Sequence, residues 1–189
     1  MVVVTIGLLL GLVAGWLRKG SFWSLGNPSM RGLWLVPVAF FLQSLAIHLL
    51  HGTAYVIMLA AGYMGMMGFA ALNLRIIGIP WMAAGTLANF TVMAVNGLRM
   101  PAYLPVVQHY NPQLVPLLLA GRLGKSIAMT SATRLDFLGD IFTFKMSPFV
   151  SLFSVGDVLI AVGLAEVMQY LMTRPKGGNV SDPVAKTAP

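Results

Sequence analysis

Apolar residues are concentrated in five long runs, which occupy residues 1–17, 33–50, 52–74, 80–98 and 148–172. The runs are roughly 17 to 25 residues long, close to the ~20 helical residues that cross the hydrocarbon core of a bilayer. Backbone groups in lipid have no water to bind, so a helix must satisfy them internally. The pattern therefore predicts an all-α polytopic transmembrane bundle with about five spanning helices.

The composition agrees with this interpretation. Hydrophobic residues make up 58% of the chain, and charged residues make up only 9%. A soluble domain would need a larger polar surface to face water. We therefore expect membrane lipids to surround most of the protein. The chain has no cysteine, which excludes disulfides and thiol chemistry.

Residues 99–147 interrupt the series of apolar runs, and we predict that they form an outer loop region. Within it, residues 104–120 are apolar at both ends but have the sequence QHYNPQ at their centre. This centre is too polar to lie in the middle of a bilayer. We predict that 104–120 is an interfacial or re-entrant segment and not a sixth span.

Basic residues indicate the orientation of the chain. Arg18 and Lys19 directly follow the first run, and cytoplasmic loops carry an excess of Lys and Arg. We predict a bacterial plasma-membrane protein with its N-terminus outside and its C-terminus in the cytoplasm. Residues 1–173 would form one transmembrane domain, and the polar residues 174–189 a disordered cytoplasmic tail. Flanking basic residues explain the net charge of +7, and we expect no binding of nucleic acid.

The carboxylates are the candidate chemical groups. None occurs in the first 135 residues, and the five are Asp136, Asp140, Asp157, Glu166 and Asp182. In the predicted topology, Asp157 lies near the outer end of the last helix, and Asp136 and Asp140 stand just outside it. Two carboxylates in close contact cannot both ionise easily, so one holds a proton while the other activates water. The alternative is that Asp157 binds backbone groups or Arg99 or Arg134 and only orders the loops.

Two short motifs lie within residues 134–163, namely the pair Asp136-Phe137 and the sequence FSVGD that ends at Asp157. They resemble the Asp-Phe and Phe-Asn-x-Ala-Asp elements of lipoprotein signal peptidase, the membrane aspartyl peptidase of bacteria. Ser154 and Gly156 stand where that family has Asn and Ala. The resemblance implies a peptidase in which Asp136 and Asp157 are the catalytic pair.

A second resemblance rests on the repeated Gly-Asp of Gly139-Asp140 and Gly156-Asp157. This repeat is similar to that of an uncharacterised family of small polytopic bacterial membrane proteins. It makes Asp140 as good a partner for Asp157 as Asp136 is.

Two functions follow from these residues. The first is an aspartyl peptidase-like hydrolase that acts on a membrane-embedded or lipid-linked peptide, with Arg99 or Asn96 orienting the substrate or an oxyanion. The second is a non-catalytic small membrane subunit of a larger complex, in which the carboxylates bind Arg99, Arg122 and Arg134.

Histidines offer a weaker alternative. His48 and His51 lie one helical turn apart, and with His109 and an Asp they could hold a metal ion. Single histidines near a membrane interface are commoner than ligands. We therefore predict no metal and no cofactor.

Overall fold

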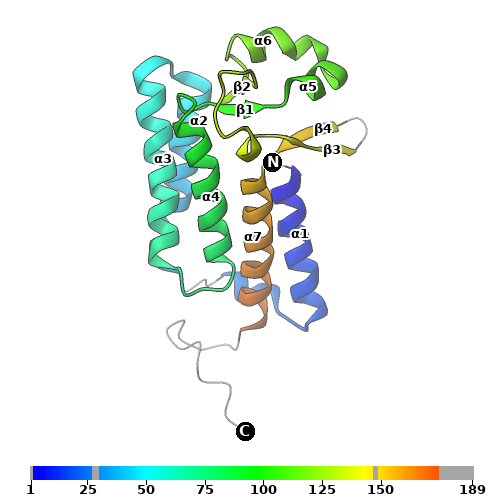
Figure 1. Cartoon of the computed structure of the whole chain (residues 1–189). Helices are drawn as coiled ribbons and strands as arrows, with labels where there is room; N and C mark the ends of the chain where they lie inside the picture. Colours follow the sequence, from blue (N-terminus) through cyan, green and yellow to red (C-terminus); the bar gives the residue numbers. More distant parts are fainter. Residues whose placement is uncertain (1, 27–29, 147–148, 175–189) are drawn as a thin grey trace.

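Five long helices run side by side and form the body of the structure (Figure 1). The computed structural model describes residues 2–26, 30–146 and 149–174. The long helices are α1 (Val2–Leu17), α2 (Leu35–Leu49), α3 (Gly52–Leu72), α4 (Ile79–Ala94) and α7 (Val155–Thr173). Each of the five predicted apolar runs thus overlaps one of these helices, and the structure is mostly helical.

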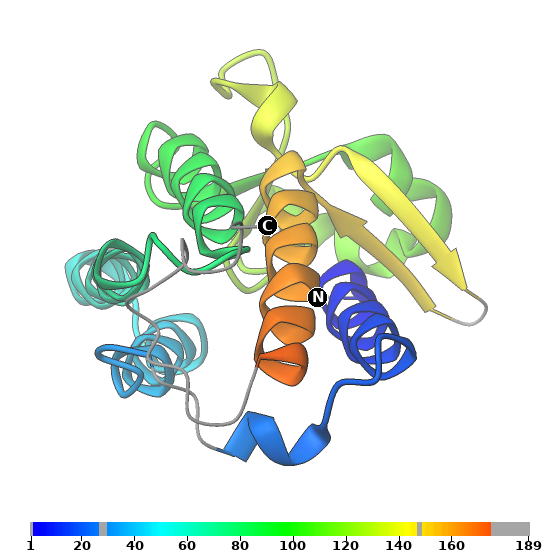
Figure 2. The same cartoon turned by 90° about the horizontal axis from the view of Figure 1, so that it is seen from below.

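The long helices form a curved row in the order α1, α7, α4, α3, α2 (Figure 2). The helix α7 packs between α1 and α4, and α3 packs between α4 and α2. This leaves α1 and α2 at the two ends of the row. The first and last helices of the chain are therefore neighbours, and both begin at the same end of the bundle (Figure 1).

Glycines bring α1 and α7 into close contact. A Cβ atom at Gly7 or Gly11 would overlap the backbone of Ala161 or Ala165 in α7. Small residues spaced four apart lie on one face of a helix, so the two backbones can approach along a continuous strip.

The contact between α4 and α7 also depends on glycines. A side chain at Gly163 would overlap the carbonyl oxygen of Gly78, and one at Gly156 would overlap Gly85 and the side-chain oxygen of Asn89. Gly78 has a φ of 92°, which favours glycine, and it precedes Pro80 in the first turn of α4. The start of α7 therefore lies directly against α4.

Smaller elements connect α4 to α7 and gather at the end of the bundle where α1 and α7 begin (Figure 1). They are β1 (Met100–Ala102), α5 (Leu104–Tyr110), η2 (Pro112–Leu114), α6 (Val115–Leu119), β2 (Ser126–Ala128), η3 (Asp136–Leu138), β3 (Phe142–Met146) and β4 (Phe149–Phe153), while η1 (Phe22–Gly26) follows α1. The strands β1 and β2 are parallel, and β3 and β4 are antiparallel with Phe142 opposite Phe153.

Buried apolar residues form three clusters. One lies among α2, α3 and α4 near the connecting elements, around Tyr55, Leu59 and Met93. A second lies at the opposite end and joins α3 and α4 to α7 around Phe69 and Val167. The third cluster lies within the connecting region, and its buried residues are Ala102, Val107, Leu118 and Ala128. The connecting region thus has a small core of its own.

The structure corrects the all-α prediction in two places. The two small sheets were not predicted, because strands of three to five residues give little periodic signal. Residues 149–153, predicted as the start of the last span, form β4, and α7 begins at Val155 because the side chain of Ser154 caps it. Residues 104–120 contain α5 and α6, which are 7 and 5 residues long and too short to cross a bilayer.

Two of the described helices, α3 and α7, are long and apolar enough to cross a membrane by length and composition. The helices α1 and α2 are apolar but shorter. The five-span topology and the division into one transmembrane domain and a tail stay predictions, and residues 175–189 of that tail lie outside the described residues.

Candidate functional site

The strand β1 holds Lys125 and Asp140 on its two edges. On one edge, the backbone N–H of Met100 donates to the carbonyl oxygen of Lys125 at 2.8 Å. On the other edge, the N–H of Asp140 donates to the carbonyl oxygen of Pro101 at 2.8 Å, and the N–H of Tyr103 donates to the carbonyl oxygen of Asp140 at 3.1 Å. Three residues of strand therefore fix the relative positions of a lysine and an aspartate that lie on separate loops.

Asp157 is held at the N-terminus of α7 by a capping box with Ser154. The Ser154 hydroxyl accepts a hydrogen bond from the Asp157 N–H at 3.0 Å, and Asp157 Oδ2 accepts one from the Ser154 N–H at 3.3 Å. The Asn89 amide of α4 donates to Asp157 Oδ1 at 2.9 Å, and its own oxygen accepts from the Ser154 hydroxyl at 2.8 Å. Both oxygens of Asp157 thus accept hydrogen bonds, which suits an ionised carboxylate.

Lys125, Asp140 and Asp157 form one electrostatic cluster. Burial, and after it the charge of Asp157, raise the pKa of Asp140 from 3.8 to about 6, although the charge of Lys125 acts in the opposite direction. Burial alone lowers the pKa of Lys125, but Tyr63, Asp140 and Asp157 raise it more, so its net pKa lies above 10.5. At neutral pH the cluster therefore contains a lysine cation and a carboxyl group that can exchange a proton.

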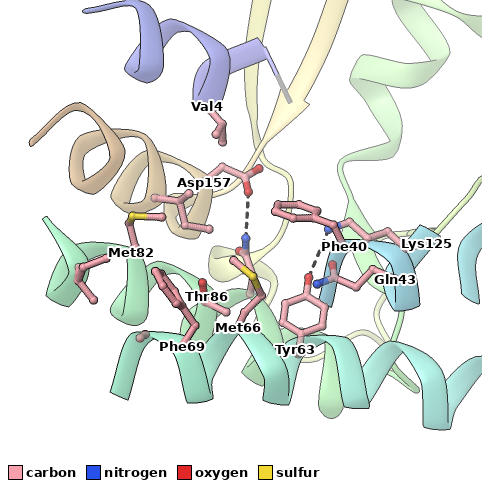
Figure 3. A pocket seen from close by; sticks show the side chains of 14 residues that line it. Val4, Phe40, Gln43, Tyr63, Met66, Phe69, Met82, Thr86, Lys125 and Asp157 are labelled. Carbon is pink, nitrogen blue, oxygen red and sulfur yellow. Dashed lines mark hydrogen bonds between the residues drawn. The ribbon is translucent and has the colours of Figure 1, made fainter. Parts of the chain in front are cut away.

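A cavity of about 130 Å³ lies among the long helices, and all five of them contribute to its wall (Figure 3). Lys125 and Asp157 both line it. The Lys125 ammonium donates to the Tyr63 hydroxyl at 3.4 Å, and Figure 3 shows this pair apart from the Asp157 carboxylate along the wall. The remaining lining residues are Val4, Phe40, Gln43, Met66, Phe69, Ala70, Ile79, Met82, Thr86, Asn89 and Ile160. Asp140 does not line the cavity.

Of the predicted carboxylates, Asp140 is the one whose charge is coupled to that of Asp157. Within the described residues, no hydrogen bond joins their carboxyl groups directly. Asp136 begins the short helix η3 and is half-buried, and its Oδ1 atom is buried without a hydrogen-bond partner in the part of the chain that the structure describes.

The predicted substrate-binding residues contact the connecting loops. The Arg99 guanidinium lies 4.2 Å from the ring centre of Tyr55 and donates to the carbonyl oxygen of Gly124 at 2.7 Å. The Asn96 side chain donates to the carbonyl oxygen of Arg134 at 2.7 Å and accepts from its N–H at 2.9 Å. Neither residue lines the cavity, and their predicted role toward a substrate stays a prediction.

The described residues show neither the ion pairs nor the metal-ligand cluster considered from the sequence, although Asp157 does bind a backbone group, the N–H of Ser154. There, no ion pair joins the carboxylates to Arg99, Arg122 or Arg134, and no three His, Asp or Glu side chains lie close enough to hold a metal ion. The contacts that order the loops are hydrogen bonds to backbone groups instead.

Sequence analysis missed Lys125, Tyr63 and Asn89. Asn89 gave a usable signal, because a buried amide inside the apolar run 80–98 is costly unless it has a partner. Lys125 and Tyr63 gave none, since a lysine in a loop and a tyrosine in an apolar helix are both ordinary. Only the folding of the loop over the bundle brings these two side chains together.

Comparison with known protein families gives one match. The sequence pattern of a family of unknown function (DUF5317) matches residues 27–169. The chain belongs to this family. The matched range includes Lys125, Asp140 and Asp157, as well as Asn89 and Tyr63, whereas α1 precedes it. No curated protein and no solved structure shows significant similarity to the chain.

Proposed function

We propose that this member of the DUF5317 family is a five-span membrane protein with its connecting region on the outer side of the plasma membrane. Large apolar side chains on the outward faces of α1 and α2 support this placement, because Leu10, Phe41 and Leu49 are each more than 60% exposed. Arg18, Lys19 and the end of α7 lie at the opposite end of the bundle from the connecting region (Figure 1). An excess of basic residues at that end favours the cytoplasm.

We further propose that the cluster of Asp140, Asp157 and Lys125 is the site of an aspartyl hydrolase that acts on a membrane-embedded peptide or a lipid-linked substrate. The observation that carries this proposal is the pairing of two carboxylates with different environments. Asp157 accepts hydrogen bonds from Asn89 and Ser154, whereas Asp140 is half-buried and takes up a proton as the pH falls through about 6. Carboxyl groups that lie in different environments are the usual basis of acid–base assignments.

In the proposed reaction, Asp157 faces the cavity and takes a proton from water as the water oxygen attacks the substrate carbonyl carbon. The Lys125 ammonium stabilises the negative charge that develops on the carbonyl oxygen. Collapse of the tetrahedral intermediate breaks the bond to the leaving group, which takes the proton from Asp157. Asp140 acts from outside the cavity, and it is protonated in the active form, so that no second negative charge lies near the Asp157 carboxylate.

The test is cleavage of defined substrates in bilayer vesicles that contain the purified protein. A fluorogenic transmembrane peptide and an N-acylated peptide would each be incubated with the wild type, Asp157→Asn and Glu166→Gln. We expect product from at least one peptide with the wild type and with Glu166→Gln, and none with Asp157→Asn. Glu166 is the matched control, because it lies on the same helix but does not line the cavity. Equal cleavage by all three proteins, or by none, would overturn the proposal.

A second candidate is a non-catalytic subunit of a membrane complex. One observation favours it: each hydrogen bond of the Asp157 carboxyl either caps α7 or joins α7 to α4. In that case Asp157→Asn and Asn89→Ala would lower the melting temperature together, and neither would change any cleavage rate.

A further inference from the structure

The cavity has a polar end and an apolar shaft. Its polar end contains Lys125, Tyr63 and Asp157, which lie toward the connecting region. On α4, the lining extends from Asn89 to Ile79, a distance of about 15 Å at 1.5 Å per residue. With a volume of about 130 Å³, the cavity suits part of an amphiphile, namely charged groups of its head and the first carbon atoms of one apolar chain.

The cavity lies close to the surface between the two ends of the helix row. Val4 of α1 and Phe40 of α2 both line it, and these helices are the first and last of the row (Figure 2). Phe40 is also 50% exposed. A chain from the surrounding lipid can therefore reach the shaft between α1 and α2.

Two opposite charges lie on the wall of the polar end. The Lys125 ammonium has three N–H donors, and its hydrogen bond in the structure is to the neutral Tyr63 hydroxyl at 3.4 Å. The Asp157 carboxylate accepts two hydrogen bonds and has lone pairs left. The wall thus offers spare donors on a cation and spare acceptors on an anion.

We infer that the cavity binds the head region of one zwitterionic phospholipid of the phosphoethanolamine class, with its phosphate at Lys125, its primary ammonium at Asp157 and the first part of one acyl chain in the shaft. A primary ammonium donates charge-assisted hydrogen bonds to a carboxylate, which a quaternary ammonium cannot do. An anionic phosphoglycerol head would bind Lys125 but has no cation for the remaining acceptor sites of Asp157. The inference rests on the proposed membrane placement and does not require hydrolysis.

The test measures lipid retention by native mass spectrometry of the purified full chain after exchange into micelles that contain phosphatidylethanolamine, phosphatidylcholine or phosphatidylglycerol. We expect the wild type to retain phosphatidylethanolamine roughly tenfold more strongly than the other two lipids, the effect of one charge-assisted hydrogen bond. Asp157→Asn should remove the preference, and Lys125→Gln should weaken retention of all three lipids. Ala70→Leu fills the shaft and should weaken retention whatever the head group.

Lys145→Gln removes an exposed lysine outside the cavity and should change nothing. Equal retention of the three lipids by the wild type would overturn the inference, and so would unchanged retention by a folded Ala70→Leu. If Lys125→Gln does not fold, the preference of the wild type still decides the question. Asp140→Asn separates the two proposals, because it should leave lipid retention unchanged while it removes the fall in cleavage as the pH rises through about 6.

Discussion

Replacing Asp140 by Asn should stabilise the protein at neutral pH and have little effect near pH 4. Burial and the neighbouring Asp157 raise the pKa of Asp140 from 3.8 to about 6. Between these two values the folded protein binds a proton that the unfolded chain has released. The free energy of unfolding of the wild type should therefore fall as the pH rises from about 4 to about 6. At higher pH it should stay at this lower value.

The shift from 3.8 to about 6 corresponds to a cost of about 3 kcal/mol, since one pKa unit is about 1.4 kcal/mol. Asn keeps the shape of the side chain and cannot ionise, so Asp140→Asn should recover up to this amount at pH 7.5. For a protein of this size, 1 kcal/mol changes the melting temperature by roughly 2–4 °C. The melting temperature should therefore rise by at most about 12 °C.

The assay is thermal unfolding in detergent, followed by tryptophan fluorescence at intervals from pH 4 to pH 8. Asp136→Asn is the matched control, because it makes the same chemical change on the same loop outside the electrostatic cluster. A variant Asp140→Asn that is no more stable than the wild type at pH 7.5 would refute the reasoning. An equal gain at pH 4 and pH 7.5 would refute it as well, since it would show that ionisation is not the cause.

Three further predictions concern the site, the helix contact and the topology. The rate of cleavage should fall as the pH rises through about 6, because Asp140 loses its proton there. A rate that does not change from pH 5 to pH 8 would show that the two carboxyl groups do not act together in cleavage. Gly156→Ala should lower the free energy of unfolding by about 1–3 kcal/mol, because the added Cβ atom would overlap α4. Gly26→Ala is the control, since its Cβ atom would meet no atom within 4 Å, and equal melting temperatures of the two variants would show that the contact between α7 and α4 is not tight. A cysteine at Thr143, in a chain that has no other cysteine, should react with a membrane-impermeant maleimide only from the outside of cells, and labelling only in inverted vesicles would reverse the proposed topology.

The sequence alone predicted the long helices, because an apolar run of about 20 residues is a local property that needs no knowledge of the partner helices. It also pointed to Asp157 and Asp140, since carboxylates near the end of an apolar helix are costly and seldom accidental. The strands of the connecting region were missed for the opposite reason. Met100 pairs with Ser126, and Ala102 pairs with Asp140, so these short strands exist only through contacts with distant residues.

Tertiary structure decided the composition of the site. The spacing of the carboxylates left Asp136 and Asp140 as equal partners for Asp157, and the hydrogen bonds of β1 place Asp140 with Lys125 in the electrostatic cluster. The cavity likewise depends on the order of the helices in the row. The helices α1 and α2 follow one another in the chain, but they lie at opposite ends of the row, and both line the cavity. Helix propensity is local, but the close approach of α4, α1 and α7 through their glycines is set by backbone contacts between segments far apart in the sequence.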